Sequence, residues 1–262
     1  MTKQLLVLLC FFSLKCSFAQ EITRHQADSM LRALSTAKPE LMRIYLLLNL
    51  AQYHIFKPGE RQIDFDSATV YINEASTLIK AVKSPAAFGY QLLTQSYLLK
   101  EKGDKVKSKK LLEEAIPLLQ SGTNKSYLGT GYFELSIYYE FWKAEELAQR
   151  IPLVQKALEA YQEAKDLKNI ARSYEMLGDL YIRQESFSEA IEALNHALRT
   201  YKEMDYPQVQ GVYVLLGEAY MDKNDYGNAL INIQKALKTS LQVNDTSMRL
   251  CQINNMMGSL YW

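Results

Sequence analysis

The feature that most constrains the fold is a repeated placement of small residues. Two stretches align without a gap: ARSYEMLGDLYIRQESFSEAIEALNHALRTYKEM at 171–204 and QGVYVLLGEAYMDKNDYGNALINIQKALKTSLQV at 210–243. Each has a Leu-Gly pair at positions 7 and 8, with Gly178 in one and Gly217 in the other, and alanines at positions 20 and 27. Small residues spaced for one helix face let two helices approach closely, so the pattern predicts pairs of packed helices.

The same small residues recur upstream with a period near 40. Position 8 is small throughout, at spacings of 45, 40, 42, 39 and 41 residues: Ala51, Ser96, Ser136, Gly178, Gly217 and Gly258. Position 27 is alanine, at spacings of 40, 42, 40 and 39 residues: Ala75, Ala115, Ala157, Ala197 and Ala236. Larger side chains there would overpack the helices at a cost of ~1–3 kcal/mol. Two ladders of one period predict a solenoid of stacked helix pairs.

These landmarks, together with aromatics at positions 4 and 11 such as Tyr174 and Tyr181, resemble the tetratricopeptide repeat (TPR). The resemblance implies an all-α TPR superhelical solenoid of five helix pairs and a truncated sixth, preceded by one N-terminal helix. We expect the solenoid to span 20–262, with repeats at 44–82, 89–121, 129–166, 171–204 and 210–243 and a partial repeat at 251–262.

The third repeat is irregular. From Ser136 to Ala157 there are 21 residues, whereas the second, fourth and fifth repeats have 19 over the same interval. Position 20 falls near Arg150, which is not small, and Pro152 lies within the expected second helix. Because proline removes a helical hydrogen bond, we expect a kink or local rewinding there.

Residues 1–19 have the layout of a secretory signal peptide. Lys3 precedes an apolar run over 5–14, and Ser17 and Ala19 provide small residues before a cut at Gln20. The run is shorter than the about 20 residues that a membrane-spanning helix needs. A lipoprotein site at Cys16 would follow Lys15, where a small residue is wanted. We expect cleavage near Ala19 and an exported, periplasmic or extracytoplasmic protein.

The charge of the chain bears on its partners, and its cysteine content bears on disulfide bonding. Without the two lysines of residues 1–19, the chain has 28 basic residues against 29 acidic ones, which predicts no binding to nucleic acid or to an anionic membrane. Cys10 and Cys16 would leave with that segment, so Cys251 would stand alone and form no internal disulfide.

The resemblance also implies a concave wall formed by exposed positions of the first helices. From it we predict a protein- or peptide-binding groove that is aromatic at its N-terminal end and mostly acidic at its C-terminal end: Tyr90, Tyr97, Phe133, Arg172, Glu175, Asp179, Arg183, Glu218 and Asp222. The alternative for the three aromatics is packing between repeats. If they bind, Tyr97→Ala and Arg183→Ala would weaken partner capture without unfolding. Position 9 is never Asn, so the chaperone-binding carboxylate clamp of some TPR proteins is not expected.

Candidates for catalysis are few. The three histidines, His25, His54 and His196, have no cysteine or carboxylate at metal-ligand spacing, and His54 occupies an aromatic packing position. We therefore expect no enzyme, no metal and no cofactor in these residues.

A signal peptide, a short helix and a TPR array together resemble the extracytoplasmic region of bacterial sensor kinases and regulators. We expect the sensory or scaffolding N-terminal region of a longer signalling protein of the histidine kinase type, with a membrane segment downstream. The alternatives are a free-standing periplasmic adaptor and the input region of a helix-turn-helix regulator. Residues 251–262 would begin a sixth repeat, leaving Met257, Leu260 and Tyr261 uncovered and able to mediate self-association.

Overall fold

A computed structural model describes residues 22–262, apart from 39, 60, 245–247 and 261–262. Over these residues the chain forms α-helices and no strand, as predicted. The helices are α1 (Arg24–Leu34), α2 (Glu40–Ile55), α3 (Gln62–Val82), α4 (Pro85–Glu101), α5 (Lys105–Gln120), α6 (Lys125–Ser136), α7 (Ala144–Glu163), α8 (Leu167–Arg183), α9 (Phe187–Glu203), α10 (Gln210–Asp222), α11 (Tyr226–Gln242) and α12 (Met248–Leu260). The predicted signal peptide lies outside the described residues.

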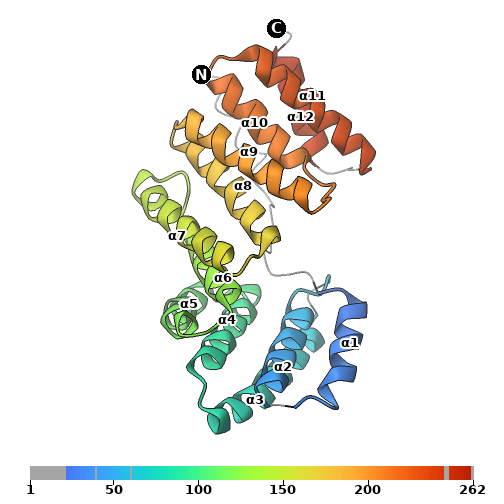
Figure 1. Ribbon diagram of the computed structural model, residues 1–262, viewed down its shortest axis with the longest axis vertical. Coiled ribbons are helices and arrows are strands. Elements are labelled where there is room, and N and C mark those ends of the chain that lie inside the picture. Colours follow the sequence, from blue (N-terminus) through green and yellow to red (C-terminus); the bar gives the residue numbers. More distant parts are fainter. Residues whose placement is uncertain (1–21, 39, 60, 245–247, 261–262) are drawn as a thin grey trace. The chain divides into compact units, whose positions relative to one another are not determined.

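Successive helices form hairpins, with α2 against α3, α6 against α7, α8 against α9 and α10 against α11 (Figure 1). The single helix α1 precedes these pairs, and α12 packs on α11 where a sixth repeat would begin. The contacts divide the chain into two compact units, residues 1–108 and 109–262, with the boundary inside α5.

The first unit is organised around α2, which contacts α1, α3 and α4. Its fully buried side chains include Ile44, Leu47 and Ile55. Helix α1 begins with a capping box, in which the Thr23 hydroxyl accepts from the Gln26 N–H and the Gln26 side chain accepts from the Thr23 N–H. These reciprocal bonds satisfy two donors that a helix start leaves open.

The second unit contains the regular part of the array. A buried cluster joins α8, α9 and α10 through Ala171, Leu194 and Leu216, and a further cluster joins α10, α11 and α12 through Val214, Ile233 and Ile253. Each helix pair thus buries its apolar stripe against the next pair, as expected when stability comes from neighbouring repeats.

The small residues of the ladders lie where helices meet. All five position-27 alanines are fully buried: Ala75, Ala115, Ala157, Ala197 and Ala236. Ala51, Ser96 and Ser136 are buried too, and the Ser108 hydroxyl at position 20 donates to the Ser96 carbonyl at 2.7 Å. Gly258 differs from the others, since a Cβ placed there would meet nothing within 4 Å. Its predicted packing role therefore has no counterpart among the described residues.

The irregularity of the third repeat lies in its first helix. Helix α6 ends at Ser136, position 8, and residues 137–143 form a loop before α7 begins at Ala144. Helix α7 runs from Ala144 to Glu163 as one helix with Pro152 inside it. Because Pro152 is exposed, water can hydrogen-bond the Ala148 carbonyl that loses its helical donor. The two extra residues enter the loop.

Candidate functional site

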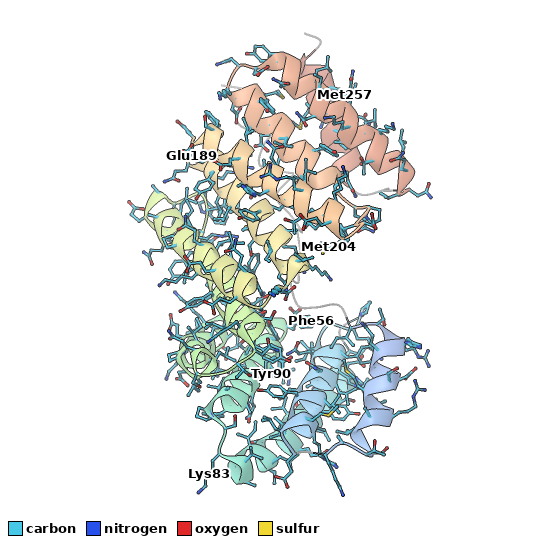
Figure 2. The ribbon with its side chains drawn as sticks, in the orientation of Figure 1. Phe56, Lys83, Tyr90, Glu189, Met204 and Met257 are labelled. Atoms are coloured by element: carbon cyan, nitrogen blue, oxygen red, sulfur yellow. The ribbon has the colours of Figure 1, made fainter. Side chains whose placement is uncertain are left out.

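The aromatic end of the predicted groove is closed. Tyr90, Tyr97 and Phe133 have exposed fractions of only 3%, 2% and 3%, so they form no open anchor zone, and packing accounts for them. Tyr97 meets the ring of Phe56 edge to face, with the ring centroids 5.1 Å apart. Figure 2 labels Tyr90 on α4 and Phe56 just after α2.

Hydrogen bonds between α2 and α4 close the same face of the first unit. The Gln52 side chain donates to the Tyr90 hydroxyl at 2.9 Å and to Thr94 Oγ1 at 3.0 Å. The Tyr90 hydroxyl in turn donates to Asn49 Oδ1. Neighbouring first helices thus satisfy each other's polar groups, which favours the packing interpretation of these positions.

The charged end of the predicted groove is assembled on α8 and α10 of the second unit. Arg183 forms ion pairs with Asp179 at 3.1 Å and with Glu218 at 3.0 Å, so it links the two helices. Burial opposes the charge of Arg183, yet Asp179 and Glu218 together raise its pKa. Burial raises the pKa of Glu218. The charges of Asp179 and Asp222 also raise it, whereas Arg183 lowers it.

Arg172 and Glu175 belong to a neighbouring cluster around Tyr201. The Tyr201 hydroxyl donates to Glu175 Oε2 at 2.9 Å. Burial and then Glu175 raise the pKa of Tyr201, whereas Arg172 opposes the shift. Glu175 thus accepts a hydrogen bond from Tyr201 of α9, so part of its hydrogen-bonding capacity is used within the fold.

Arg150 and the loop 137–143 adjoin the charged end, and the predicted groove did not include them. Arg150 is only 9% exposed; it donates to the Tyr139 carbonyl at 3.1 Å and contacts Met176 Sδ at 3.6 Å. The guanidinium carbons of Arg150 and Arg183 lie 5.9 Å and 6.0 Å from the centroid of the Phe141 ring. We call Phe141, Arg150, Asp179, Arg183, Glu218 and Asp222 the Phe141 cluster.

The loop also presents an exposed aromatic residue. Trp142 is 64% exposed, and its ring meets Phe141 edge to face at 4.9 Å. Glu146 of α7 fixes the loop, because its carboxylate accepts from the Glu140 N–H at 2.7 Å and pairs with Lys143 at 2.8 Å. The two-residue excess and the aromatic run at 138–142 are the sequence signals that could have located this loop.

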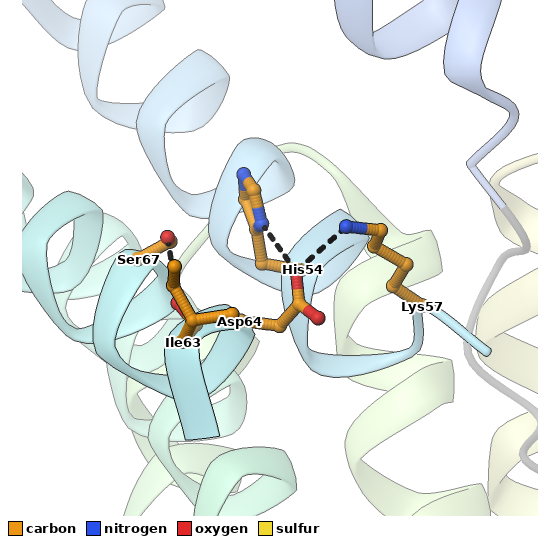
Figure 3. Close-up of polar contacts among 5 residues, drawn as sticks. All are labelled: His54, Lys57, Ile63, Asp64 and Ser67. Atoms are coloured by element: carbon orange, nitrogen blue, oxygen red, sulfur yellow. Dashed lines mark hydrogen bonds and ion pairs between the residues drawn. The ribbon is translucent and has the colours of Figure 1, made fainter. Parts of the chain in front are cut away.

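A second polar cluster occupies the first unit, where α2 turns into α3 (Figure 3). The carboxylate of Asp64 is 5% exposed and accepts from Lys57 at 2.8 Å, with His54 Nδ1 at 3.5 Å. Lys57 lowers the pKa of Asp64, and His54 lowers it further, whereas burial acts to raise it. His54 also stacks on Tyr71 at 5.7 Å, so this cluster links the end of α2 and Lys57 to α3.

The described part of the chain contains neither a candidate metal site nor a candidate membrane-spanning helix. No group of three or more His, Cys, Asp or Glu side chains there could hold a metal ion. Likewise, none of the helices described has the length and apolarity to cross a membrane.

Family models of the tetratricopeptide repeat match residues 141–203 and 211–242. The chain contains tetratricopeptide repeats over these two ranges. TPR repeats mediate protein–protein interaction or scaffolding by binding proteins or peptides, and the TPR fold is typically non-catalytic. No match was found among curated protein sequences.

Solved structures of other proteins share the fold at low identity. BtubC (BKLC) from P. vanneervenii has a TM-score of 0.65 at 18% identity, covering 85% of this chain and 92% of that one. A signal transduction ATPase (STAND) protein with a TPR sensor from Pyrococcus horikoshii has a TM-score of 0.61 at 12% identity. The match covers 91% of this chain and 40% of that one. Rap protein complexed with competence and sporulation factor has a TM-score of 0.57 at 13% identity. The match covers 87% of this chain and 62% of that one. The chain thus spans less than two thirds of the last two.

Proposed function

We propose that this TPR protein is an exported module that binds a protein or peptide through the Phe141 cluster and Trp142. The observation that carries the proposal is an indole that is 64% exposed beside partly buried arginines and carboxylates. Tryptophan and arginine are over-represented among the residues that dominate binding energy at protein interfaces. This surface replaces the buried aromatics as the anchor zone.

The finer proposal is the sensory or scaffolding N-terminal region of a longer bacterial signalling protein of the histidine kinase type. It is supported by the signal-peptide layout of residues 1–19 and by the likeness of fold to the TPR sensor of the Pyrococcus horikoshii protein. Rap protein, which shares the fold, was crystallised with a competence and sporulation factor. We propose no catalytic role and no nucleic-acid partner for these residues.

Capture from an envelope extract tests the binding site. The wild-type protein, Trp142→Ala and Glu192→Gln are each cross-linked to the extract and compared. Glu192 lies on α9 with a side chain that is 77% exposed, so its variant is the matched surface control. We expect one partner to be retained by wild type and control and lost by Trp142→Ala. Equal retention by all three would contradict the proposed site.

Export and membership of a longer protein need their own measurements. Mass spectrometry of the protein from the producing cell should give a mature N-terminus at Gln20. A coding sequence that continues past Trp262 into about 20 apolar residues would support the signalling region, because that length spans a bilayer. A stop codon there would favour the alternative of a free-standing periplasmic adaptor, and a helix-turn-helix domain downstream would favour a transcriptional regulator.

A further inference from the structure

We propose that the partner segment is a basic peptide, whose Lys or Arg side chain binds among Asp179, Glu218 and Asp222 while an adjacent apolar side chain packs on Trp142. This inference rests on the proposed function and specifies the chemistry of its partner.

The first step is the charge balance of the site. The single guanidinium of Arg183 pairs with both Asp179 and Glu218, at 3.1 Å and 3.0 Å. Asp222, a turn along α10 from Glu218, adds a third carboxylate, and its charge acts on Glu218 together with that of Asp179. Arg183 forms the ion pairs, and the charge of Arg150 also acts on Asp179, so three carboxylates face two cations and one negative charge is left over. A further cation would relieve this repulsion, and the partial burial of Glu218 strengthens the attraction.

The second step concerns a hydrogen-bond donor rather than charge. Arg150 is nine-tenths buried, and its Nε–H has no acceptor, whereas one of its terminal nitrogens reaches only the thioether of Met176. Its guanidinium faces Phe141 and lies within electrostatic reach of Asp179 and Glu140. A buried donor without an acceptor costs free energy. Because this nitrogen is fully buried, a peptide carbonyl oxygen can accept from it only if the loop 137–143 moves.

The third step is the apolar anchor. Trp142 stands on a loop held by the Glu146 carboxylate, so its exposed ring is positioned before any partner arrives. A large rigid side chain that is already ordered loses little conformational entropy on binding. An apolar residue next to the basic one can cover it, and the combination excludes water from the ion pair.

A carboxylate-bearing ligand is the opposite assignment, because Arg150 and Arg183 both approach the Phe141 ring. Both arginines, however, already lie beside Asp179, and Glu140 and Glu218 add further negative charge. An incoming carboxylate would meet these groups, so the charge balance favours the basic peptide.

The test uses the full chain and three synthetic peptides of equal length that alternate leucine with lysine, glutamine or glutamate. The chain has two tryptophans, so Trp262→Phe leaves Trp142 as the fluorescent reporter of its own surroundings. We expect the lysine peptide to change Trp142 emission and to bind about tenfold tighter than the glutamine peptide, which one partly buried ion pair can supply. Binding should weaken with added salt.

Charge-neutral variants locate the contact. Glu218→Gln and Asp222→Asn should each weaken binding of the lysine peptide by about tenfold and leave binding of the glutamine peptide unchanged. Glu192→Gln should change the binding of neither peptide. Thermal unfolding confirms that each variant is folded, and the isosteric substitutions keep the side-chain volume. Lysine-peptide binding unaffected by both variants would overturn the inference.

Other outcomes separate this inference from the function on which it rests. Tighter binding of the glutamate peptide would overturn the basic partner in favour of a carboxylate at Arg150 and Arg183. If no peptide binds but Trp142→Ala still abolishes capture from the envelope extract, the inference fails and the proposed function stands. If both measurements are negative, both fail.

Discussion

Gly178 of α8 lies directly against Leu194 of α9, so that a Cβ at Gly178 would come within 2.4 Å of Leu194 Cγ. Gly217 meets Ile233 in the same way, at 2.6 Å. Both contacts join position 8 of the first helix to position 24 of the second, so the two helices of each of these repeats approach closely there. The side chain across from the glycine, rather than either alanine of the ladder, is what a substitution would strike.

We therefore expect Gly178→Ala to lower the free energy of unfolding by ~1–3 kcal/mol, the usual cost of overpacking, and Gly178→Leu to lower it further. Denaturant unfolding measures the change. Gly258→Ala is the matched control, because it changes the same repeat position where nothing lies within 4 Å. The control should be neutral or stabilising, since alanine favours a helix over glycine. An unchanged Gly178→Ala would disprove the repeat register.

We expect Tyr97 to contribute to the stability of the fold and not to partner capture. Its ring is buried against Phe56, so Tyr97→Ala should lower the free energy of unfolding by about 3–5 kcal/mol, as large-to-small core substitutions do. Circular dichroism during urea titration gives the value. Phe88→Ala, an exposed aromatic on the same helix, should cost far less. A stable Tyr97→Ala protein with impaired capture would restore the aromatic anchor zone.

Asp64 should contribute a pH-dependent part of the stability. Lys57, with His54, holds the pKa of this carboxyl below its ordinary 3.8 in the folded state. The stabilisation is thus complete above about pH 4 and is lost as the pH falls through the lowered value. Asp64→Asn should destabilise the protein at pH 7 and much less at pH 2.

Unfolding of wild type and Asp64→Asn across that range measures the difference. Asp66→Asn, two residues along and exposed, serves as the comparison. A gap between wild type and Asp64→Asn that stays constant with pH would show that the carboxylate charge contributes nothing.

Arg150 should hold the loop 137–143 in place. Arg150→Ala removes the donor to the Tyr139 carbonyl and the cation beside Phe141, and we expect a loss of about 1–3 kcal/mol. Hydrogen–deuterium exchange should become faster in the loop. Gln149→Ala, the exposed neighbour on α7, should leave exchange there unchanged. Equal exchange in both variants would argue against the role given to Arg150.

The spacing of small residues was sufficient to predict the all-α solenoid, because close helix packing has a local signature in glycine, alanine and serine. The early end of α6 had no such signature. It depends on Arg150 reaching Tyr139 across the loop and on the contacts of Phe141, which are tertiary and join residues of α7 and α8. The length of the interval after Ser136 showed that something was inserted but not where the helix would stop.

The predicted groove positions differ in exposure: the three aromatics are buried, and the charged residues of α8 and α10 are partly exposed. A first-helix position of the predicted groove can face a neighbouring helix instead of solvent, as Tyr90 does through Gln52. Sequence periodicity gives the direction of a side chain along its own helix, not the distance to the next one. The charged positions Asp179, Arg183 and Glu218 stayed partly exposed, because ion pairs link α8 to α10 without burying either side chain fully.

The loop 137–143 shows how this architecture accommodates a change in length at one surface. Two additional residues were accommodated there while Ala157 kept its place in the buried ladder. A change in length at such a junction alters the chemistry of one surface and leaves the neighbouring repeats in register. Recognition and stability can then be selected separately in the same chain, which makes the third repeat the natural position for grafting a different loop.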